Sequence, residues 1–432
     1  MRLAEPADHR IRLALLAGAV VSFAMIGGLS GLVVVFSFVV MLVLHELGHL
    51  LVARWSGMQV TEFFIGFGPR LWSVRRGECT YGVKAIPAGA YVRITGMTNL
   101  DEVDPAEEHR TYRAQSYPRR LAVALAGSAT HFAMSLLLLF ILYGLVGTPD
   151  PDRWMVGEVV PGTTAAAIDV RSGDRILSVD GVEVHDFEDF GAVVRSSPGE
   201  TLKVVLERDG SRNVMSATIG ERLGADGVAR GFFGVGRERP LVTVGPLAAV
   251  GDALERFGDL TVMSIDGLTS FFSPDGLARF FTGAISADGP DSGRGNGSES
   301  RPAGQEGVVD TRTADSGGAM VAPDDADDER LLSIYGAARL GGAMLADGWA
   351  TYLWFLVLIN VFIGVFNLVP LLPLDGGHVA IATYERLRSF GGRRHTADAA
   401  KLVPVTWAVV SLLVLVGMVA LYRDIVDLPD LG

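Results

Sequence analysis

The chain has 432 residues, 49% of them hydrophobic, and its mean hydropathy is positive. This apolar excess indicates a membrane protein rather than a soluble enzyme. The formal net charge of −12 argues against nucleic acid as a partner, because binding it requires an excess of basic residues. The single cysteine, Cys79, excludes an intramolecular disulfide and a zinc site built from several thiolates.

Apolar stretches long enough to cross the hydrocarbon core as helices occur at four places. They cover residues 32–54, 120–146, 350–369 and 402–422. A fifth apolar stretch, residues 11–29, follows a basic N-terminus. A cleavable signal peptide and an additional span are both compatible with this pattern. We favour the span, joined to the next one through the small residues GGLSG.

Basic residues are concentrated in two short connections, residues 54–120 and 386–401. Because cytoplasmic loops carry an excess of Lys and Arg, both connections are predicted to be cytoplasmic. This orientation places residues 147–349 on the outer side of the membrane. With an odd number of spans, the acidic tail DIVDLPDLG also lies outside.

The outer segment has three parts of different composition. Residues 154–235 alternate strand-like runs with turn residues, which predicts a small folded domain. Residues 241–282 have an amphipathic helical pattern. The following stretch, ADGPDSGRGNGSESRPAGQEG, has almost no apolar residues to bury, so we expect it to be disordered.

The motif HELGH, residues 45–49, lies inside the first of the four spans. His45 and His49 are four residues apart, so on a helix they share one face and can bind one metal ion, with Glu46 beside them. Neutral imidazoles suit zinc, and the glutamate can take a proton from water, as in metal-assisted hydrolysis. A chance pattern or a polar helix end is the alternative, but such residues at membrane depth are costly unless functional.

A catalytic zinc site needs a third protein ligand, and the sequence offers two candidates. Glu62 lies in the glycine-rich stretch TEFFIGFGPR, outside any convincing helix. Asp375 ends an apolar span broken by Pro370 and Pro373 in FNLVPLLPLDGGH. A broken helix in a membrane requires cover by protein or by a water-filled cavity, which favours an inward-facing Asp375. The alternative for Asp375 is a solvated turn residue.

HELGH in one span and NLVPLLPLDGG in a later one, with a folded domain between them, resemble the site-2 protease family of intramembrane zinc metalloproteases. The resemblance covers most of the chain, because YGVKAIPAGAYVRITGM is similar to the family's membrane-associated β-hairpin and SGDRILSVDGVEV to the core of a PDZ domain. Within the family, the chain looks most like the bacterial branch that cleaves anti-sigma factors and remnant signal peptides.

The resemblance implies that zinc is bound by His45, His49 and Asp375, with Glu46 as general base and acid. Asn367, in an Asn-x-x-Pro sequence, would help to hold an extended substrate backbone. An unwound substrate also needs partners for its backbone groups, which strand addition to a sheet edge would provide. We expect this edge in the hairpin at residues 80–94; an interfacial anchor is the alternative. The expected contacts are Tyr81, Val83, Lys84 and Ala85.

Two positions depart from the family pattern. The sequence AGSATHF has Ser128 and His131 where the family usually has AGPxxN. His131 is either a metal-proximal group or a hydrogen-bonded structural histidine. Ala90 in IPAGAYV occupies a position where a second glycine is common, which alters the expected edge geometry.

We therefore expect a multi-pass protein of the bacterial plasma membrane: a polytopic α-helical fold with four core spans, an extra N-terminal span, a membrane-associated β-hairpin and an extracytoplasmic PDZ-like α+β domain. Its expected segments are 1–30, basic segment and extra span; 31–56, catalytic span; 57–119, cytoplasmic loop with hairpin; 120–146, span; 150–238, PDZ-like domain; 239–282, amphipathic helical segment; 283–330, disordered linker; 331–349, connecting helix; 350–380, span with NLVPLLPLDGG; 381–401, basic cytoplasmic loop; 402–422, span; and 423–432, tail.

The expected activity is zinc-dependent hydrolysis of peptide bonds in or near the transmembrane segments of single-span membrane proteins. Iron or cobalt would fit the same ligand types. A catalytically silent scaffold that presents the PDZ-like domain is one alternative, and a loss of Glu46 or Asp375 would have favoured it. A zinc transporter is another, but it needs ligands spread across the spans rather than gathered at one depth. Whether the PDZ-like domain binds peptide ends or excludes bulky ectodomains stays open.

Overall fold

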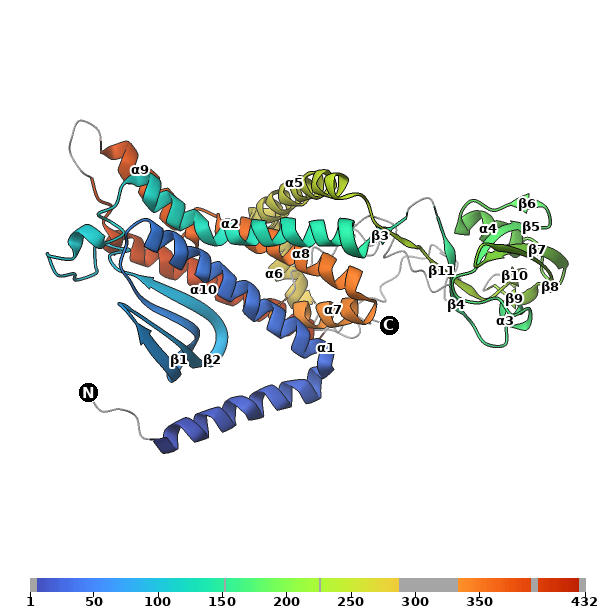
Figure 1. Cartoon of the computed structure of the whole chain (residues 1–432), viewed down its shortest axis with the longest axis horizontal. Coiled ribbons are helices and arrows are strands. Elements are labelled where there is room, and N and C mark those ends of the chain that lie inside the picture. The colour runs from blue at the N-terminus through green and yellow to red at the C-terminus, as the bar shows by residue number, and fades with distance from the viewer. Residues whose placement is uncertain (1–5, 151–152, 225–226, 287–332, 390–394, 427–432) are drawn as a thin grey trace. The chain divides into compact units, whose positions relative to one another are not determined.

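The computed structural model describes residues 6–150, 153–224, 227–286, 333–389 and 395–426 (Figure 1). Two compact units divide the chain. The helical unit contains Met1–Ile141, Leu247–Asp288 and Glu329–Gly432, and the β-rich unit contains Leu142–Pro246 and Gly289–Asp328. Most of the stretch predicted to be a disordered linker, residues 283–330, lies outside the described residues.

Helices dominate the first of these units. They are α1 (Pro6–Trp55), η1 (Glu108–Arg110), α2 (Tyr117–Ile141), α5 (Pro246–Phe271), α6 (Pro274–Ser286), α7 (Ile334–Ala346), α8 (Trp349–Asn367), α9 (Asp375–Arg388) and α10 (Ala399–Val426). Helix α1 bends at Gly28, which has φ 63° and ψ −170°, a conformation that glycine adopts readily because it has no Cβ.

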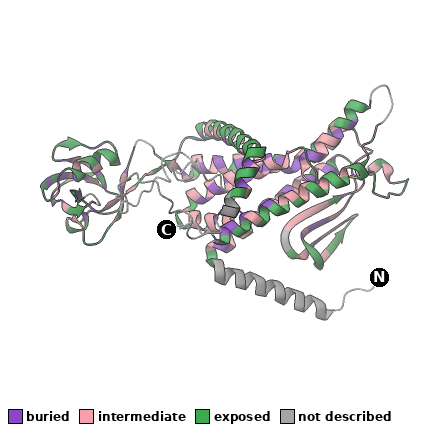
Figure 2. Cartoon of the chain, turned by 180° about the vertical axis from the view of Figure 1, so that it is seen from behind, coloured by how far each residue is buried: buried purple, intermediate pink, exposed green. Residues whose placement is uncertain are grey.

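Four described helical stretches are long and apolar enough to cross a membrane. They are Gly28–Trp55, Tyr117–Val146, Trp349–Asn367 and Ala399–Ile425. Each overlaps one of the four apolar stretches of the sequence, so the multi-pass character of the protein is confirmed. Figure 2 shows exposed residues on the outer faces of these helices and buried residues where they meet. The exposed faces suit contact with lipid.

Helix α2 packs against α1, α8 and α9. Small residues permit this close packing, as is common between helices in membranes. Ala124, Ala126, Gly127 and Ser128 are all buried on α2. On α1, a Cβ at Gly48 would lie 2.9 Å from the carbonyl oxygen of Ala126, so the glycine of HELGH lets α1 approach α2.

The strands of the helical unit, β1 (Val60–Arg76) and β2 (Cys79–Ile94), each bend back on themselves (Figure 1). The first part of β1 pairs on one side with residues 90–94 and on the other with residues 80–83. The last part of β1 pairs with residues 79–84. The segments therefore lie in the order 90–94, 60–65, 79–84, 70–76, and the two outer segments form the sheet edges.

Within its described residues, the β-rich unit contains short strands and three short helical elements. They are η2 (Leu142–Val146), β3 (Thr148–Pro149), β4 (Met155–Val159), α3 (Thr164–Ala167), β5 (Arg175–Val179), β6 (Val182–Glu183), α4 (Phe187–Arg195), β7 (Thr201–Arg208), β8 (Ser211–Thr218), β9 (Gly220–Leu223), β10 (Ala229–Phe232), β11 (Val235–Glu238) and β12 (Leu241–Val242). Its largest sheet has the order β6-β5-β7-β8, with all pairs antiparallel.

Alternating apolar residues on β7, two buried residues of β5 and the apolar face of α4 form the core of this unit. Ile176, Val204 and Leu206 are almost completely buried, and Phe190 packs edge-on against Phe233. The Asp186 side chain caps α4 by accepting a hydrogen bond from the Asp189 N–H at 2.7 Å. The unit therefore has a hydrophobic core of its own.

Candidate metal centre

Helix α1 presents two imidazoles on one face. His45 and His49 are 8% and 7% exposed, and their Nε2 atoms are 3.2 Å apart. The Nδ1–H of His49 donates to the carbonyl oxygen of Val123 on α2, at 2.8 Å. In the neutral imidazole this hydrogen bond leaves the Nε2 lone pair free to bind a metal.

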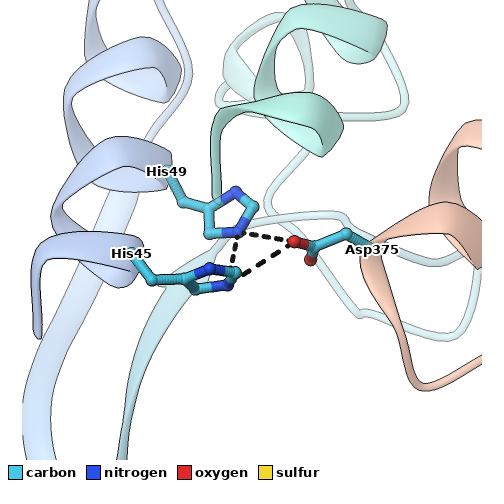
Figure 3. Close-up of side chains that lie close together, drawn as sticks. All are labelled: His45, His49 and Asp375. Carbon is cyan, nitrogen blue, oxygen red and sulfur yellow. Dashed lines mark hydrogen bonds and ion pairs between the residues drawn. The ribbon is translucent and has the colours of Figure 1, made fainter. Parts of the chain in front are cut away.

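Asp375 is the first residue of α9 and reaches the same point from another part of the chain (Figure 3). Its Oδ2 lies 3.2 Å from Nε2 of His49 and 3.5 Å from Nε2 of His45. The glycines after it allow the tight turn between α8 and α9. A Cβ at Gly377 would lie 2.6 Å from the backbone nitrogen of Leu372, so a larger residue cannot fit there without movement.

The three atoms that face each other are electron-pair donors. Asp375 Oδ2 is buried and has no hydrogen-bond donor among the residues that the structure describes. A proton shared between Asp375 and one histidine would leave the other imidazole nitrogen without a partner. A cation between the three atoms would accept an electron pair from each of them. Tetrahedral zinc with ligand bonds of about 2.0–2.2 Å separates its ligand atoms by about 3.3 Å. The observed separations of 3.2–3.5 Å fit this ion.

Gly127 on α2 provides the space for this cluster. A Cβ at this position would lie 2.5 Å from Nε2 of His49 and 2.6 Å from Nε2 of His45. Any side chain at residue 127 would therefore occupy the place where the two imidazoles converge. Glu46 follows His45 on α1 and is half-buried, and its carboxyl group has the backbone amide of Val92 as a hydrogen-bonding partner.

The other residues singled out in the sequence are not part of the three-residue cluster. Asn367 is the half-buried last residue of α8. Tyr81 and Val83 belong to the inner segment of the sheet and pair on both sides, Tyr81 with Phe63 and Val74. Lys84 pairs with Arg70, and Ala85 follows it. Tyr81 and Val83 are therefore not placed at a sheet edge, because β1 pairs with both sides of their segment.

Glu62, the rival third ligand, accepts a hydrogen bond from the Tyr91 hydroxyl at 2.6 Å and is not part of the three-residue cluster. His131 is fully buried, and its Nδ1–H donates to Oδ1 of Asn360 at 2.8 Å. Its ring lies 5.1 Å from that of His45. Sequence reasoning missed Asn360, although it is a polar residue within the apolar run WFLVLINVFIG.

A buried His-His-Asp cluster beside a glutamate, on helices suited to a membrane, defines a membrane metallohydrolase. The chain matches Peptidase family M50 over residues 33–292 and 311–414 and belongs to this family, the site-2 proteases.

Relatives with high coverage agree with this assignment. The chain is 33% identical over 411 residues to zinc metalloprotease Rip1 of Mycobacterium tuberculosis, which covers 89% of this chain and 94% of the relative. It is 32% identical over 440 residues to zinc metalloprotease Rip1 of Mycolicibacterium smegmatis, covering 93% and 98%. The protein is thus a zinc metalloprotease and a multi-pass membrane protein, which confirms the predicted enzyme class and cofactor.

Proposed function

We propose that this protease hydrolyses peptide bonds within or near the transmembrane segments of single-span membrane proteins, with anti-sigma factors and remnant signal peptides as substrate classes. The depth of the metal cluster supports this proposal. His45 lies ten residues before the end of its span at Trp55 (55 − 45). At about 1.5 Å per helical residue, this is about 15 Å, or half of a hydrocarbon core of about 30 Å.

In the proposed mechanism, Nε2 of His45, Nε2 of His49 and a carboxylate oxygen of Asp375 hold zinc. The bound ion would supply Lewis acidity, which polarises a carbonyl group and makes water nucleophilic at neutral pH. His49 is fixed for this task by its hydrogen bond to Val123. Gly127 leaves room for the ligand atoms to meet.

Glu46 is the proposed general base and acid. It is beside His45 in sequence and one helical turn from His49, so its carboxylate can take a proton from the attacking water. The same carboxyl group can then return the proton to the leaving amine. The contact with the Val92 backbone places this group next to an edge segment of the sheet.

For the extended substrate, we propose strand addition along residues 90–94 rather than at Tyr81 and Val83. An added strand needs a row of backbone groups on an outer segment, and residues 90–94 form one of the two edges. Glu46 adjoins this edge through Val92. Asn367, at the end of the span that leads to Asp375, is proposed to hold the substrate backbone by hydrogen bonds.

We further propose that the β-rich unit is an extracytoplasmic PDZ-like domain and that the two basic connections are cytoplasmic. The antiparallel sheet, helix α4 and the independent core are compatible with such a domain. The concentration of basic residues in the short connections supports the orientation. In this arrangement the domain would receive peptide ends or exclude bulky ectodomains.

The test is cleavage of a single-span substrate in a bilayer, with zinc content measured in parallel. Glu46→Gln is expected to retain zinc and to lose ~10²–10⁴-fold in rate, because only the general base is removed. Asp375→Asn is expected to lose zinc as well, because two imidazoles remain as ligands. The exposed Glu188→Gln in α4 removes the same kind of charge outside the site and is the matched control.

Undiminished cleavage by Glu46→Gln would contradict the assigned mechanism. If wild type cleaves none of a panel of single-span substrates but cuts a soluble unfolded protein, the proposed substrate class is wrong. Failure on both would favour the alternative of a silent scaffold.

A further inference from the structure

A pocket of about 400 Å³ lies beside the end of helix α1, where the chain enters the sheet. Its charged lining residues are Arg54 of α1, Arg76 and Glu78 at the turn between β1 and β2, and Arg110 of η1. We name it the basic pocket. Three guanidinium groups therefore face one carboxylate, and the lining has an excess of positive charge.

The single carboxylate of the basic pocket is already neutralised. Glu78 accepts two hydrogen bonds from Arg110, at 2.7 and 2.5 Å, and Arg110 also contacts Glu107 at 3.2 Å. Among the described residues, neither Arg54 nor Arg76 forms an ion pair with Glu78. The Arg54 guanidinium lies over the Tyr81 ring, 5.6 Å from its centre, and this contact does not neutralise its charge. Guanidinium groups bind phosphate oxygens through two parallel N–H donors, so the pocket suits a phosphate group.

The end of α1 gives the depth of the pocket in the membrane. The span ends at Trp55, whose side chain is 81% exposed and directly follows Arg54. Tryptophan prefers the headgroup level of a bilayer. Leu51, one turn earlier, is also exposed. Exposed apolar side chains on α1 are thus followed by a guanidinium group. This order matches that of the acyl chains and the charged headgroup in a phospholipid.

The outer segment of β1 shows the same order independently. Trp72 and Val74 are exposed, and Arg76 follows on the same face because side chains alternate along a strand. These three residues lie on the sheet edge formed by residues 70–76. Two elements, one a helix and the other a strand, therefore run from exposed apolar side chains to guanidinium groups that line one pocket.

We propose that the basic pocket binds the phosphate of an anionic phospholipid, whose acyl chains lie against the exposed apolar side chains of α1 and β1. A soluble phosphate or an acidic peptide would use the guanidinium groups but not the adjoining apolar faces. The bound lipid would connect the catalytic helix to the turn of the sheet. The negative charge of the membrane would thereby help to hold the sheet against α1.

The test uses the purified full chain and counts retained lipid by native mass spectrometry after transfer from micelles that contain phosphatidylglycerol or phosphatidylcholine. The test variant is Arg54→Gln with Arg76→Gln. The control, Arg75→Gln with Arg119→Gln, removes the same charge from two exposed residues outside the pocket. Each substitution removes charge-assisted hydrogen bonds to the phosphate, about tenfold in affinity for each arginine, so we expect binding of phosphatidylglycerol about 100-fold weaker than wild type.

The control is expected to bind like wild type, and unchanged zinc content would show that both variants are folded. Arg76→Gln alone, at an exposed strand end, provides a milder variant with about a tenfold effect. Equal loss in test and control variants would overturn the proposal, as would equal retention of phosphatidylcholine. Displacement of the lipid by millimolar inorganic phosphate, or by an acidic peptide, would also overturn it in favour of a soluble ligand.

Discussion

Asp375 in the helical unit and Asp174 in the β-rich unit are inward-facing aspartates with opposite surroundings. Asp174 is 1% exposed, and Arg208 donates to both of its oxygens at 2.7 Å. The backbone N–H of Arg171 donates to Oδ2 as well, at 2.8 Å. Asp375 instead directs an oxygen at the Nε2 atoms of His45 and His49.

The surroundings of Asp174 are those of a residue that supports folding, whereas the surroundings of Asp375 are those of a metal ligand. A buried carboxylate that has its donors in the fold contributes to stability and is available for nothing else. A carboxylate that meets the lone pairs of two imidazoles costs stability until a cation lies between them. Mutations around Asp375 should therefore affect metal binding, and mutations around Asp174 should affect folding.

The largest effect is expected from Gly127→Ala, which tests whether the space between the imidazoles is needed. The new methyl group would lie 2.5 Å from Nε2 of His49, so the ligands must move apart. A displacement of about 1 Å can cost about 10²-fold in rate, and we expect this loss together with reduced zinc affinity. Competition with a chelator and cleavage of a single-span substrate measure the two effects.

Gly258→Ala in α5 is the matched control for that change, because a Cβ there meets nothing within 4 Å. It should leave zinc affinity and cleavage unchanged. Normal zinc affinity in Gly127→Ala would show that the cluster is more tolerant than its geometry indicates.

The next effect concerns Arg208→Gln, which leaves Asp174 buried without its main partner. The buried carboxylate would then lose its main hydrogen-bond donor, which lowers folding stability. We expect amide hydrogen exchange in β5 and β7 of the full chain to accelerate while zinc content stays at the wild-type level. Arg212→Gln, at an exposed site on β8, should change neither quantity. Loss of zinc in Arg208→Gln would show that the two places are not independent.

The smallest effect is a pH dependence of the β-rich unit. Burial raises the pKa of Asp174, but the hydrogen bonds from Arg208 and from the Arg171 backbone, together with the charges of both arginines, outweigh it, and the pKa is lowered overall. A lowered pKa in the folded state stabilises the fold above the unfolded value of about 3.9, and this contribution is lost as pH falls from there through the folded value. One proton limits the slope to about 1.4 kcal/mol per pH unit.

Protection factors of amides in β5 and β7 at pH 7 and pH 3 measure this dependence. Asp174→Asn removes the titrating group, so its protection should fall less between the two pH values than that of wild type. An equal fall in both proteins would mean that other carboxyl groups control the acid sensitivity.

The apolar runs of the sequence located the long helices well, because a membrane span depends on local composition. The motif HELGH was also informative from local sequence alone. Residues four apart share a helical face, so the sequence placed His45 and His49 on one side of α1. Asp375 required an argument from the broken span around Pro370 and Pro373, and the structure brings it to both histidines.

Features that depend on pairing between distant segments were not predictable in this way. Nothing local in YGVKAIP indicates that Tyr81 and Val83 belong to an inner segment, because this follows from β1 folding along both sides of it. The partnership of His131 with Asn360 joins residues 229 positions apart on α2 and α8. The contribution of Gly127 is likewise visible only when α1 and α2 are packed together.

The place of His45 ten residues inside its span also bears on the fate of the products. A transmembrane helix cut at this depth is divided into two apolar stubs of about ten residues each. A helix needs about 20 apolar residues to cross the bilayer, so neither stub can remain as a span. If the protease cuts its substrate at this depth, as proposed above, one cut would detach both halves from the membrane toward opposite compartments.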